Sequence, residues 1–304
     1  EPVVRMPVVA LQNAVSFRLI ADEIRRAIGE VPYLIAVGSP FFDARLLMAR
    51  FFYAVVEGPA PWNFIMPYTT VVVPSRFAYD NMINRGWRIA GIVPHAVPTD
   101  LYNRPPRPPL TGQANLLYIA PYISRKYGSV SGLSSVKYPF SLTVITTKDN
   151  PYLDYFSKFG TVYTEWGKLN RDKLLELYSS SHFYLNLSTS EGFGLTVLEA
   201  LASGRPVIHA DFMPLSEITT PECSVRFPYG YTKTYPIPGG LSITEHRYSE
   251  ISLAGAINRA LQIYYEHPKV YRYMCDVAYE RSRSFSPELY RAFLSTRSVA
   301  HVAL

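Results

Sequence analysis

Short apolar runs alternate with amphipathic stretches along most of the chain. The runs are rich in Val, Ile, Leu, Phe and Tyr, which is typical of strands buried on both faces of a parallel sheet. We expect strands at residues 3–11, 33–37, 52–56, 70–73, 91–93, 115–120, 140–146, 161–164, 182–187 and 206–209. Helical spacing or helix start and stop signals predict helices at 16–28, 43–50, 75–86, 171–179, 195–202, 251–266, 268–284 and 287–296. This alternation favours a doubly wound α/β fold.

A proline-rich segment at residues 104–109, RPPRPP, separates two halves of this pattern. Such a segment is typical of a stiff linker between domains. The chain of 304 residues is long enough for two domains of ordinary size. We therefore predict one Rossmann-like domain at residues 1–108 and a second at 109–304, with helices at the end of the second.

The most informative stretch is SEGFGLTVLEALASGRPVI, from Ser190 to Ile208. It reads as a glycine-containing turn, a helix and a strand. Glycine lets a ligand approach the backbone closely, and the first N–H groups of a helix lack partners within the helix. The helix dipole also favours an anion at this end. The donors expected at this helix start are the amides of Phe193, Gly194, Leu195 and Thr196, and Gly192, like Gly194, has no Cβ in the way of a ligand.

Two acids frame this predicted anion site. Glu191 precedes the glycines, and Glu199 lies within the helix. Acids near a helix start also occur simply because they complement the helix dipole. A phosphate site with carboxylates beside it nevertheless suits a ligand that also carries hydroxyl groups, such as a sugar or a ribose, because carboxylates accept hydrogen bonds from hydroxyls.

The whole stretch resembles the donor-site signature of retaining glycosyltransferases of family 4, also described as glycosyl transferases group 1. The matching residues are Ser188, Glu191, Gly192, Phe193, Gly194, Glu199, Ala200, Ala202, Gly204, Pro206 and Val207. The resemblance implies a GT-B fold, in which two Rossmann-like domains hold the donor site in the cleft between them. It implies a nucleotide-diphospho-sugar donor, with its ribose on Glu199 and its sugar hydroxyls near Glu191.

The same resemblance implies further site residues. The family places an Arg and a Lys after the first strand of the second domain to hold the diphosphate. Lys126 falls at the Lys position, whereas Pro121 stands at the Arg position and Arg125 is the candidate replacement. Lys168 lies in the loop where the family has part of its base pocket. Glu57 is a candidate for the catalytic face of a shortened first domain, although an ordinary loop acid fits it equally well. The candidate catalytic residues are Glu191, Lys126 and Glu57.

The amino-acid composition limits the classes of partner and the cellular locations that we expect. The net charge of +6 is spread along the chain without a Lys/Arg cluster, so no nucleic-acid partner is expected. Two cysteines without metal-ligand spacing suit a reducing compartment, and no apolar run is long enough to span a membrane. We expect a cytoplasmic protein, with peripheral contact to the inner face of a membrane as a further option. No cofactor or metal is expected, since no Asp-x-Asp pair stands beside a strand.

The predicted activity is metal-independent transfer of a hexose from a nucleotide sugar, such as a UDP- or GDP-sugar, to a saccharide, lipid or protein acceptor. Two alternatives use the same scaffold: a sugar-nucleotide epimerase, and a nucleotide-sugar-binding protein without turnover. The shortened first domain, Pro121 and the lack of a catalytic-face His favour the binding protein.

Overall fold

The computed structural model describes residues 35–38, 51–54, 70–83, 89–97, 110, 112–237 and 241–288. Contacts divide the chain into two compact units. The first comprises Glu1–Val93, Pro236–Ser242 and Thr296–Leu304, and the second comprises Pro94–Tyr235 and Ile243–Ser295. The predicted boundary at residue 108, the linker at 104–109 and the elements at 3–11, 16–28 and 43–50 lie outside the described residues, as does most of the helix at 287–296.

The described part of the first unit is a four-stranded parallel sheet in the order β1-β2-β3-β4. Its strands are β1 (Ile35–Gly38), β2 (Phe51–Ala54), β3 (Thr70–Val73) and β4 (Ile89–Ile92). Helix α2 (Arg76–Ile83) follows β3. Ser75 caps this helix, because its Oγ accepts a hydrogen bond from the N–H of Ala78 at 3.0 Å.

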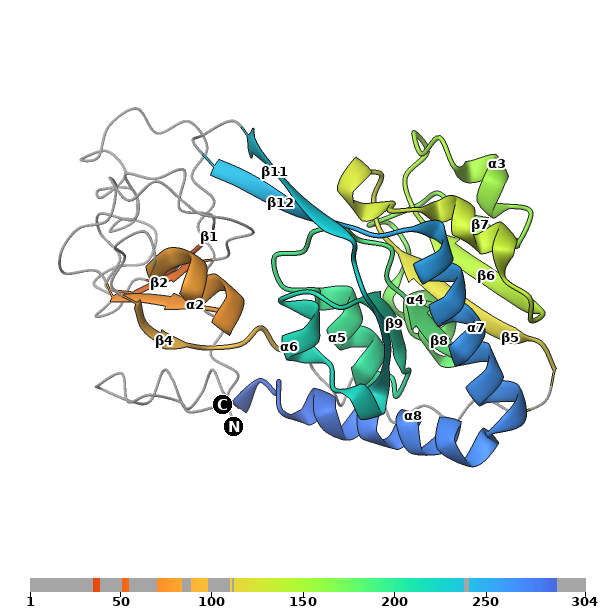
Figure 1. The fold of residues 1–304 in the computed structure, drawn as a ribbon. Helices are drawn as coiled ribbons and strands as arrows, with labels where there is room; N and C mark the ends of the chain where they lie inside the picture. The colour runs from red at the N-terminus through yellow and green to blue at the C-terminus, as the bar shows by residue number, and fades with distance from the viewer. Residues whose placement is uncertain are drawn as a thin grey trace. The chain divides into compact units, whose positions relative to one another are not determined.

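The second unit contains a six-stranded parallel sheet in the order β10-β9-β8-β5-β6-β7 (Figure 1). The strands are β5 (Ala114–Ile119), β6 (Phe140–Ile145), β7 (Gly160–Tyr163), β8 (Phe183–Leu185), β9 (Val207–Ala210) and β10 (Ser224–Phe227). Counted within the unit, this is the Rossmann order 3-2-1-4-5-6. The order reverses between β5 and β8, and in open α/β sheets ligands bind outside the strand ends at such a switch point.

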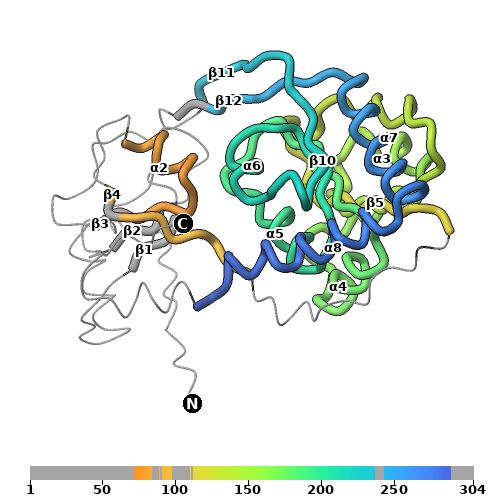
Figure 2. Tube along the Cα trace, turned by 60° about the horizontal axis from the view of Figure 1, so that its bottom comes forward, coloured from red at the N-terminus to blue at the C-terminus, as the bar shows by residue number. Residues whose placement is uncertain are grey.

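Helices and short 3₁₀ turns connect these strands. The α-helices are α3 (Leu153–Phe156), α4 (Arg171–Ser180), α5 (Leu195–Ala202), α6 (Leu215–Ile218), α7 (Glu250–Glu266) and α8 (Pro268–Arg283). The 3₁₀ turns are η3 (Ser124–Lys126), η4 (Val130–Ser135) and η5 (Pro221–Cys223). Helix α8 packs against α5, and α7 packs against η4 and β10, as can be followed in Figure 2.

The sequence analysis did not predict β10, α3 or a hairpin in the second half. Strands β11 (Tyr231–Ile237) and β12 (Leu241–Arg247) follow β10 and precede α7 in the sequence. They form a two-stranded sheet, drawn as a long hairpin in Figure 1. The signal for the hairpin was present. The runs YTKTY and ITEHRY alternate in side-chain type and are separated by Pro238-Gly239-Gly240, which is a turn sequence.

The core of the second unit lies on the faces of its sheet. All residues of β8 and β9 are buried. Burial on both faces explains why these strands read as continuous apolar runs in the sequence. Helix α5 contributes Val197, Leu198 and Ala200 to the same core, and this apolar face fixes where the helix start lies relative to the sheet.

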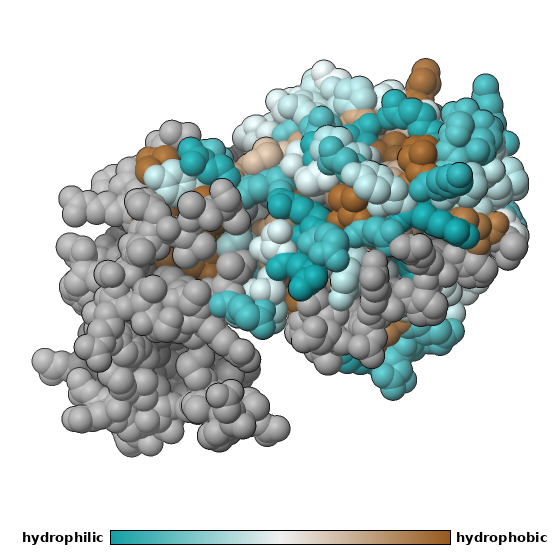
Figure 3. All heavy atoms as spheres, turned by 90° about the horizontal axis from the view of Figure 1, so that it is seen from below, coloured by the Kyte–Doolittle hydropathy of each residue, from teal (hydrophilic) through white to brown (hydrophobic). Residues whose placement is uncertain are grey.

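The described surface is mainly hydrophilic on the side shown in Figure 3, with separate apolar residues between polar ones. None of the helices that the structure describes combines the length with the apolar composition that a membrane crossing requires.

Arg205, in the loop after α5, is fully buried and links this loop to the end of α4. Its Nε donates to the carbonyl of Tyr178 at 2.9 Å, and its Nη2 donates to that of Ser179 at 2.8 Å. Both carbonyls belong to the last turn of α4, where the helix dipole favours a cation. The hydroxyl of Tyr178 in turn donates to Oε2 of Glu199 at 2.8 Å. The buried arginine thus fixes the residue that positions Glu199.

Candidate active site

Two loops meet at the switch point of the second unit. One follows β5 and includes η3, and the other is the turn at residues 186–194 between β8 and α5. The amide of Gly128 donates to the carbonyl of Leu187 at 2.9 Å, and the amide of Thr189 donates to that of Arg125 at 2.7 Å. The glycine-containing turn therefore lies at the strand ends where this topology binds ligands.

The side chains of Lys126 and Glu191, one from each loop, form an ion pair, and both are largely buried. Burial by itself would raise the pKa of Glu191. The charge and hydrogen bond of Lys126 oppose it, with contributions from Ser188 and Arg125, and the pKa lies below the usual glutamate value. Glu191 is therefore ionised at neutral pH.

Arg125 also contacts the turn. Its Nη1 donates to the carbonyl of Ser190 at 2.9 Å. The backbone beside it is held from the sheet, because the hydroxyl of Tyr118 on β5 donates to the carbonyl of Lys126. The structure therefore brings Arg125, Lys126 and Glu191 together, although they come from parts of the sequence that are more than sixty residues apart.

Glu199 is partly buried on α5. The hydrogen bond from Tyr178 holds its Oε2. The amides of Leu195 and Thr196 lie in the first turn of the same helix, before the amide of Val197, which donates to the carbonyl of Gly194 at 3.0 Å. Such first-turn amides have no acceptor within the helix, so they can donate to an anion.

Gly194 has a different structural role from the one that the sequence suggested. The expectation was that its missing side chain leaves room for phosphate. In the structure, a Cβ at this position would lie 2.8 Å from Cδ2 of Leu215 and 3.5 Å from Cδ1 of Ile218, both on α6. The φ of Gly194 is +104°, which side-chain-bearing residues rarely adopt. Glycine is therefore required by packing and by backbone conformation.

His95, in the segment that follows β4, packs edge-on against Phe193 with 4.8 Å between ring centroids. Burial lowers the pKa of His95 to about 4, so the ring is neutral at physiological pH. This contact joins the segment at 94–97 to the glycine-containing turn. It agrees with an interpretation of His95 as a structural residue and not as a general base.

The remaining predicted residues lie in another loop or outside the described residues. Lys168 is exposed in the turn after β7, where its amide donates to the carbonyl of Glu165 at 2.8 Å. Glu57 lies outside the described residues. Within the part of the chain that the structure describes, no three His, Cys, Asp or Glu side chains are grouped as metal ligands.

Sequence reasoning missed the residues that cover the turn from the side of β12. The amide of His246 donates to the carbonyl of Thr189 at 2.7 Å. The ring of His246 stacks on Phe212 with 4.4 Å between centroids. The hydroxyl of Tyr248 lies 2.6 Å from the carbonyl of Leu187. Nothing in the spacing of these residues from the motif indicates these contacts, because they depend on where the hairpin returns to the sheet.

The fold is that of the GT-B glycosyltransferases. A glycosyltransferase from Rickettsia africae ESF-5 aligns with a TM-score of 0.67 over 94% of this chain and 83% of that chain, at 15% sequence identity. An identity this low establishes the likeness of fold alone. The predicted fold class is confirmed by this likeness and by the parallel sheets described above.

The family match includes the glycine-containing turn and α5. Residues 164–223 match the family described as Glycosyl transferases group 1. The protein named "Putative glycosyltransferase ORF330" of Acidianus filamentous virus 2 is 28% identical over 125 residues, which are 38% of this chain and 37% of that protein. The "UDP-N-acetylglucosamine--peptide N-acetylglucosaminyltransferase GtfA subunit" of Streptococcus pneumoniae is 54% identical over 39 residues, which are 13% of this chain and 8% of that protein.

These matches span less than two thirds of either relative. They support a glycosyltransferase, without indicating its donor, its acceptor or its stereochemistry. Assignment to family 4 and a shortened first domain stay predictions.

The packing role of Gly194 predicts that Gly194→Ala destabilises the fold more than a matched change at Gly167. Both glycines have positive φ, but a Cβ at Gly167 would meet nothing within 4 Å. We expect about 1–3 kcal/mol from backbone strain at either position and roughly 1–3 kcal/mol more at Gly194 from the contact with Leu215. Urea denaturation measures both variants, and equal losses would contradict the packing role.

The Lys126–Glu191 pair predicts a pH-dependent contribution to stability. Because the folded-state pKa of Glu191 lies below its ordinary value of 4.5, the contribution is complete above that pH and is lost as the pH falls through the folded-state pKa. Between pH 7 and about pH 3, the free energy of unfolding should therefore fall more for the wild type than for Glu191→Gln. Urea denaturation at each pH tests this, and parallel curves for the two proteins would show that the pair contributes nothing.

Proposed function

We propose that this chain is a glycosyltransferase that moves a sugar from a nucleotide-diphospho-sugar to an acceptor. The observation that carries the proposal is the meeting of Lys126, Glu191 and the start of α5 at the switch point of the second unit. Most of these elements belong to the segment that matches glycosyl transferases group 1.

In this proposal the diphosphate of the donor lies between Lys126 and the amides at residues 192–196. An ammonium group has three donors, so Lys126 can bind Glu191 and a phosphate oxygen together. Arg125, which binds the carbonyl of Ser190, places a second cation beside the turn. Glu199, held by Tyr178, would accept from the ribose hydroxyls, and Glu191 would face hydroxyls of the sugar.

The chemistry follows from where charge develops. As the bond between sugar and phosphate breaks, negative charge builds on the leaving diphosphate. Cations and helix-start amides that are already in place stabilise such charge without reorganisation. They would take the part that a divalent cation plays in metal-dependent enzymes, so we propose metal-independent transfer. Retention of the anomeric configuration is part of the proposal through the family resemblance.

The relatives suggest which substrates to test first. The streptococcal relative is named for UDP-N-acetylglucosamine and for a peptide acceptor. We therefore propose a UDP-sugar as the first donor to try, before a GDP- or ADP-sugar, and a protein as the first acceptor. Saccharides, and lipids at the cytoplasmic face of a membrane, are the next acceptors in the proposal.

A nucleotide-sugar-binding protein without turnover is the second candidate. It needs only Arg125, Lys126 and the turn, which all lie in the second unit, and no residue of the first unit. An epimerase on the same scaffold would instead release a free sugar epimer without any acceptor.

A thermal-shift screen followed by a transfer assay tests the proposal. A nucleotide sugar that binds only the folded state must raise its melting temperature. We expect one of the UDP-, GDP- or ADP-sugars to do so, and sugar transfer with that donor to continue in EDTA.

If no donor raises the melting temperature, the proposed donor site is wrong. Loss of transfer on chelation, with recovery on adding manganese, would make the metal-independent mechanism wrong. Binding without transfer or hydrolysis would favour the second candidate.

Glu199→Gln tests the ribose contact. A hydrogen bond to a charged group contributes about 1.5–3 kcal/mol, so the affinity for the nucleoside diphosphate should fall roughly tenfold or more. Calorimetry measures this loss. Glu176→Gln, which alters an exposed acid paired with Lys173 on α4, is the matched control and should bind like the wild type. Equal affinities for the two variants would exclude Glu199 from the site.

A further inference from the structure

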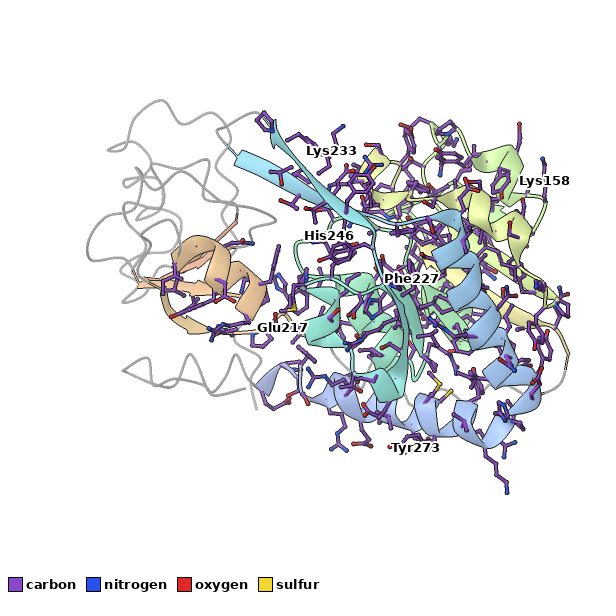
Figure 4. All side chains as sticks on the ribbon, viewed as in Figure 1. Lys158, Glu217, Phe227, Lys233, His246 and Tyr273 are labelled. Atoms are coloured by element: carbon purple, nitrogen blue, oxygen red, sulfur yellow. The ribbon has the colours of Figure 1, made fainter. Side chains whose placement is uncertain are left out.

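The base of the β11–β12 hairpin is attached to both loops of the candidate donor site. His246 binds the carbonyl of Thr189 through its amide at 2.7 Å. The hydroxyl of Tyr248 lies 3.0 Å from the carbonyl of Gly128 and 2.6 Å from that of Leu187. Figure 4 shows His246 near the base of the hairpin and Lys233 farther along β11. Side chains near this base are therefore held in a fixed position relative to the site.

Glu245, the residue before His246, is a buried acid with an unusual environment. Its Oε1 accepts a hydrogen bond from the hydroxyl of Tyr235 at 2.5 Å. Its Oε2 forms an ion pair with Nη2 of Arg247 and has no hydrogen bond among the described residues. A buried carboxylate needs compensation of its charge. Arg247 supplies it.

Arg247 differs from Glu245 in exposure. Its side chain is 43% exposed, whereas that of Glu245 is 2% exposed. The guanidinium therefore extends from a buried acid toward solvent. It has five N–H donors in a rigid fork, so the contact between Nη2 and Glu245 does not use its full capacity. This arrangement fixes the direction of a cation and keeps donors for another partner.

Arg247 and Arg125 lie near the same group. Burial and the hydrogen bond that Tyr235 donates to Glu245 raise the pKa of Tyr235 to about 12, while the charges of Arg125 and Arg247 both act to lower it. The contacts agree with this: Tyr235 and Arg247 both bind Glu245, and the next residue, His246, binds Thr189, whose amide in turn donates to the carbonyl of Arg125. Arg125 also binds the carbonyl of Ser190, directly before Glu191. The hairpin therefore brings a further cation to the cluster formed by Arg125 and Lys126.

We propose that Arg247, positioned by Glu245, is a third phosphate-binding cation of this site and recognises the diphosphate of the donor. The inference rests on the proposed function. A guanidinium fork matches phosphate oxygens in a bidentate manner, which an ammonium group cannot do. The hairpin is then a part of the donor site, and Glu245 is a positioning residue that acts through Arg247.

The test uses the full chain and calorimetry with UDP, GDP and ADP. The diphosphate that binds the wild type is then compared with its own monophosphate. Arg247→Gln should weaken diphosphate binding roughly tenfold, because a hydrogen bond to a charged group is lost, and should weaken monophosphate binding less. Lys233→Gln removes the same charge from an exposed position of the same hairpin and should keep wild-type affinity. Equal affinities for the two variants would overturn the inference.

Arg247→Gln also leaves Glu245 buried without its cation, which can destabilise the fold. A second comparison avoids this difficulty. Glu245→Gln and the double variant Glu245→Gln/Arg247→Gln both lack the buried charge and differ only at Arg247. The double variant should bind the diphosphate more weakly than Glu245→Gln, and the inference fails if both bind alike. If the wild type binds none of the three diphosphates, the proposed function itself fails, which is a separate result.

Discussion

The buried ion pair between Lys126 and Glu191 is the contact on which the arrangement of the candidate site depends. It joins the loop after β5 to the turn after β8, at the point where the strand order reverses. Removing two charges from water costs several kcal/mol for each ion, and an apolar pair of similar volume is often at least as stable. Stability alone therefore does not account for charges at this position. A ligand that uses the ammonium group and the carboxylate does.

Buried tyrosine hydroxyls hold the backbone around this pair. Tyr118 binds the carbonyl of Lys126, Tyr184 binds that of Ile119 and Tyr248 contacts that of Leu187. Burial raises the pKa of all three tyrosines, so each hydroxyl keeps its proton at physiological pH and remains a donor. The hydroxyl of Tyr184 thereby gives a donor to the carbonyl at the end of β5, where the chain leaves the ladder. The site is thus held by neutral donors that do not compete for its charges.

The sequence predicted the parts of this site that depend on local pattern. The turn and the start of α5 follow from glycine positions, apolar spacing and the motif, and the strand before them follows from its continuous apolar run. The family resemblance implied that Lys126 and Glu191 bind the same ligand, but it did not predict that the two side chains contact each other. The space beside Gly194 was misjudged, because its occupant, Leu215, comes from a different helix. The hairpin contacts were missed since they are set by tertiary packing, which a single sequence does not display.

The Lys126–Glu191 pair and the Arg247–Glu245 pair are alike in that their two side chains differ in exposure, which affects the kind of ligand they can bind. In each pair the carboxylate is less exposed than its cation: 9% for Glu191 against 14% for Lys126, and 2% for Glu245 against 43% for Arg247. A ligand that arrives from solvent therefore meets the cations first. The carboxylates reduce the repulsion between neighbouring cations and fix their directions, while the cations keep more donors than one carboxylate oxygen can accept. Such a surface attracts a multiply charged anion more than a neutral sugar, because the attraction grows with the charge of the ligand. If the ligand is a nucleotide sugar, as proposed, its diphosphate is thus the part that this arrangement of charges attracts most.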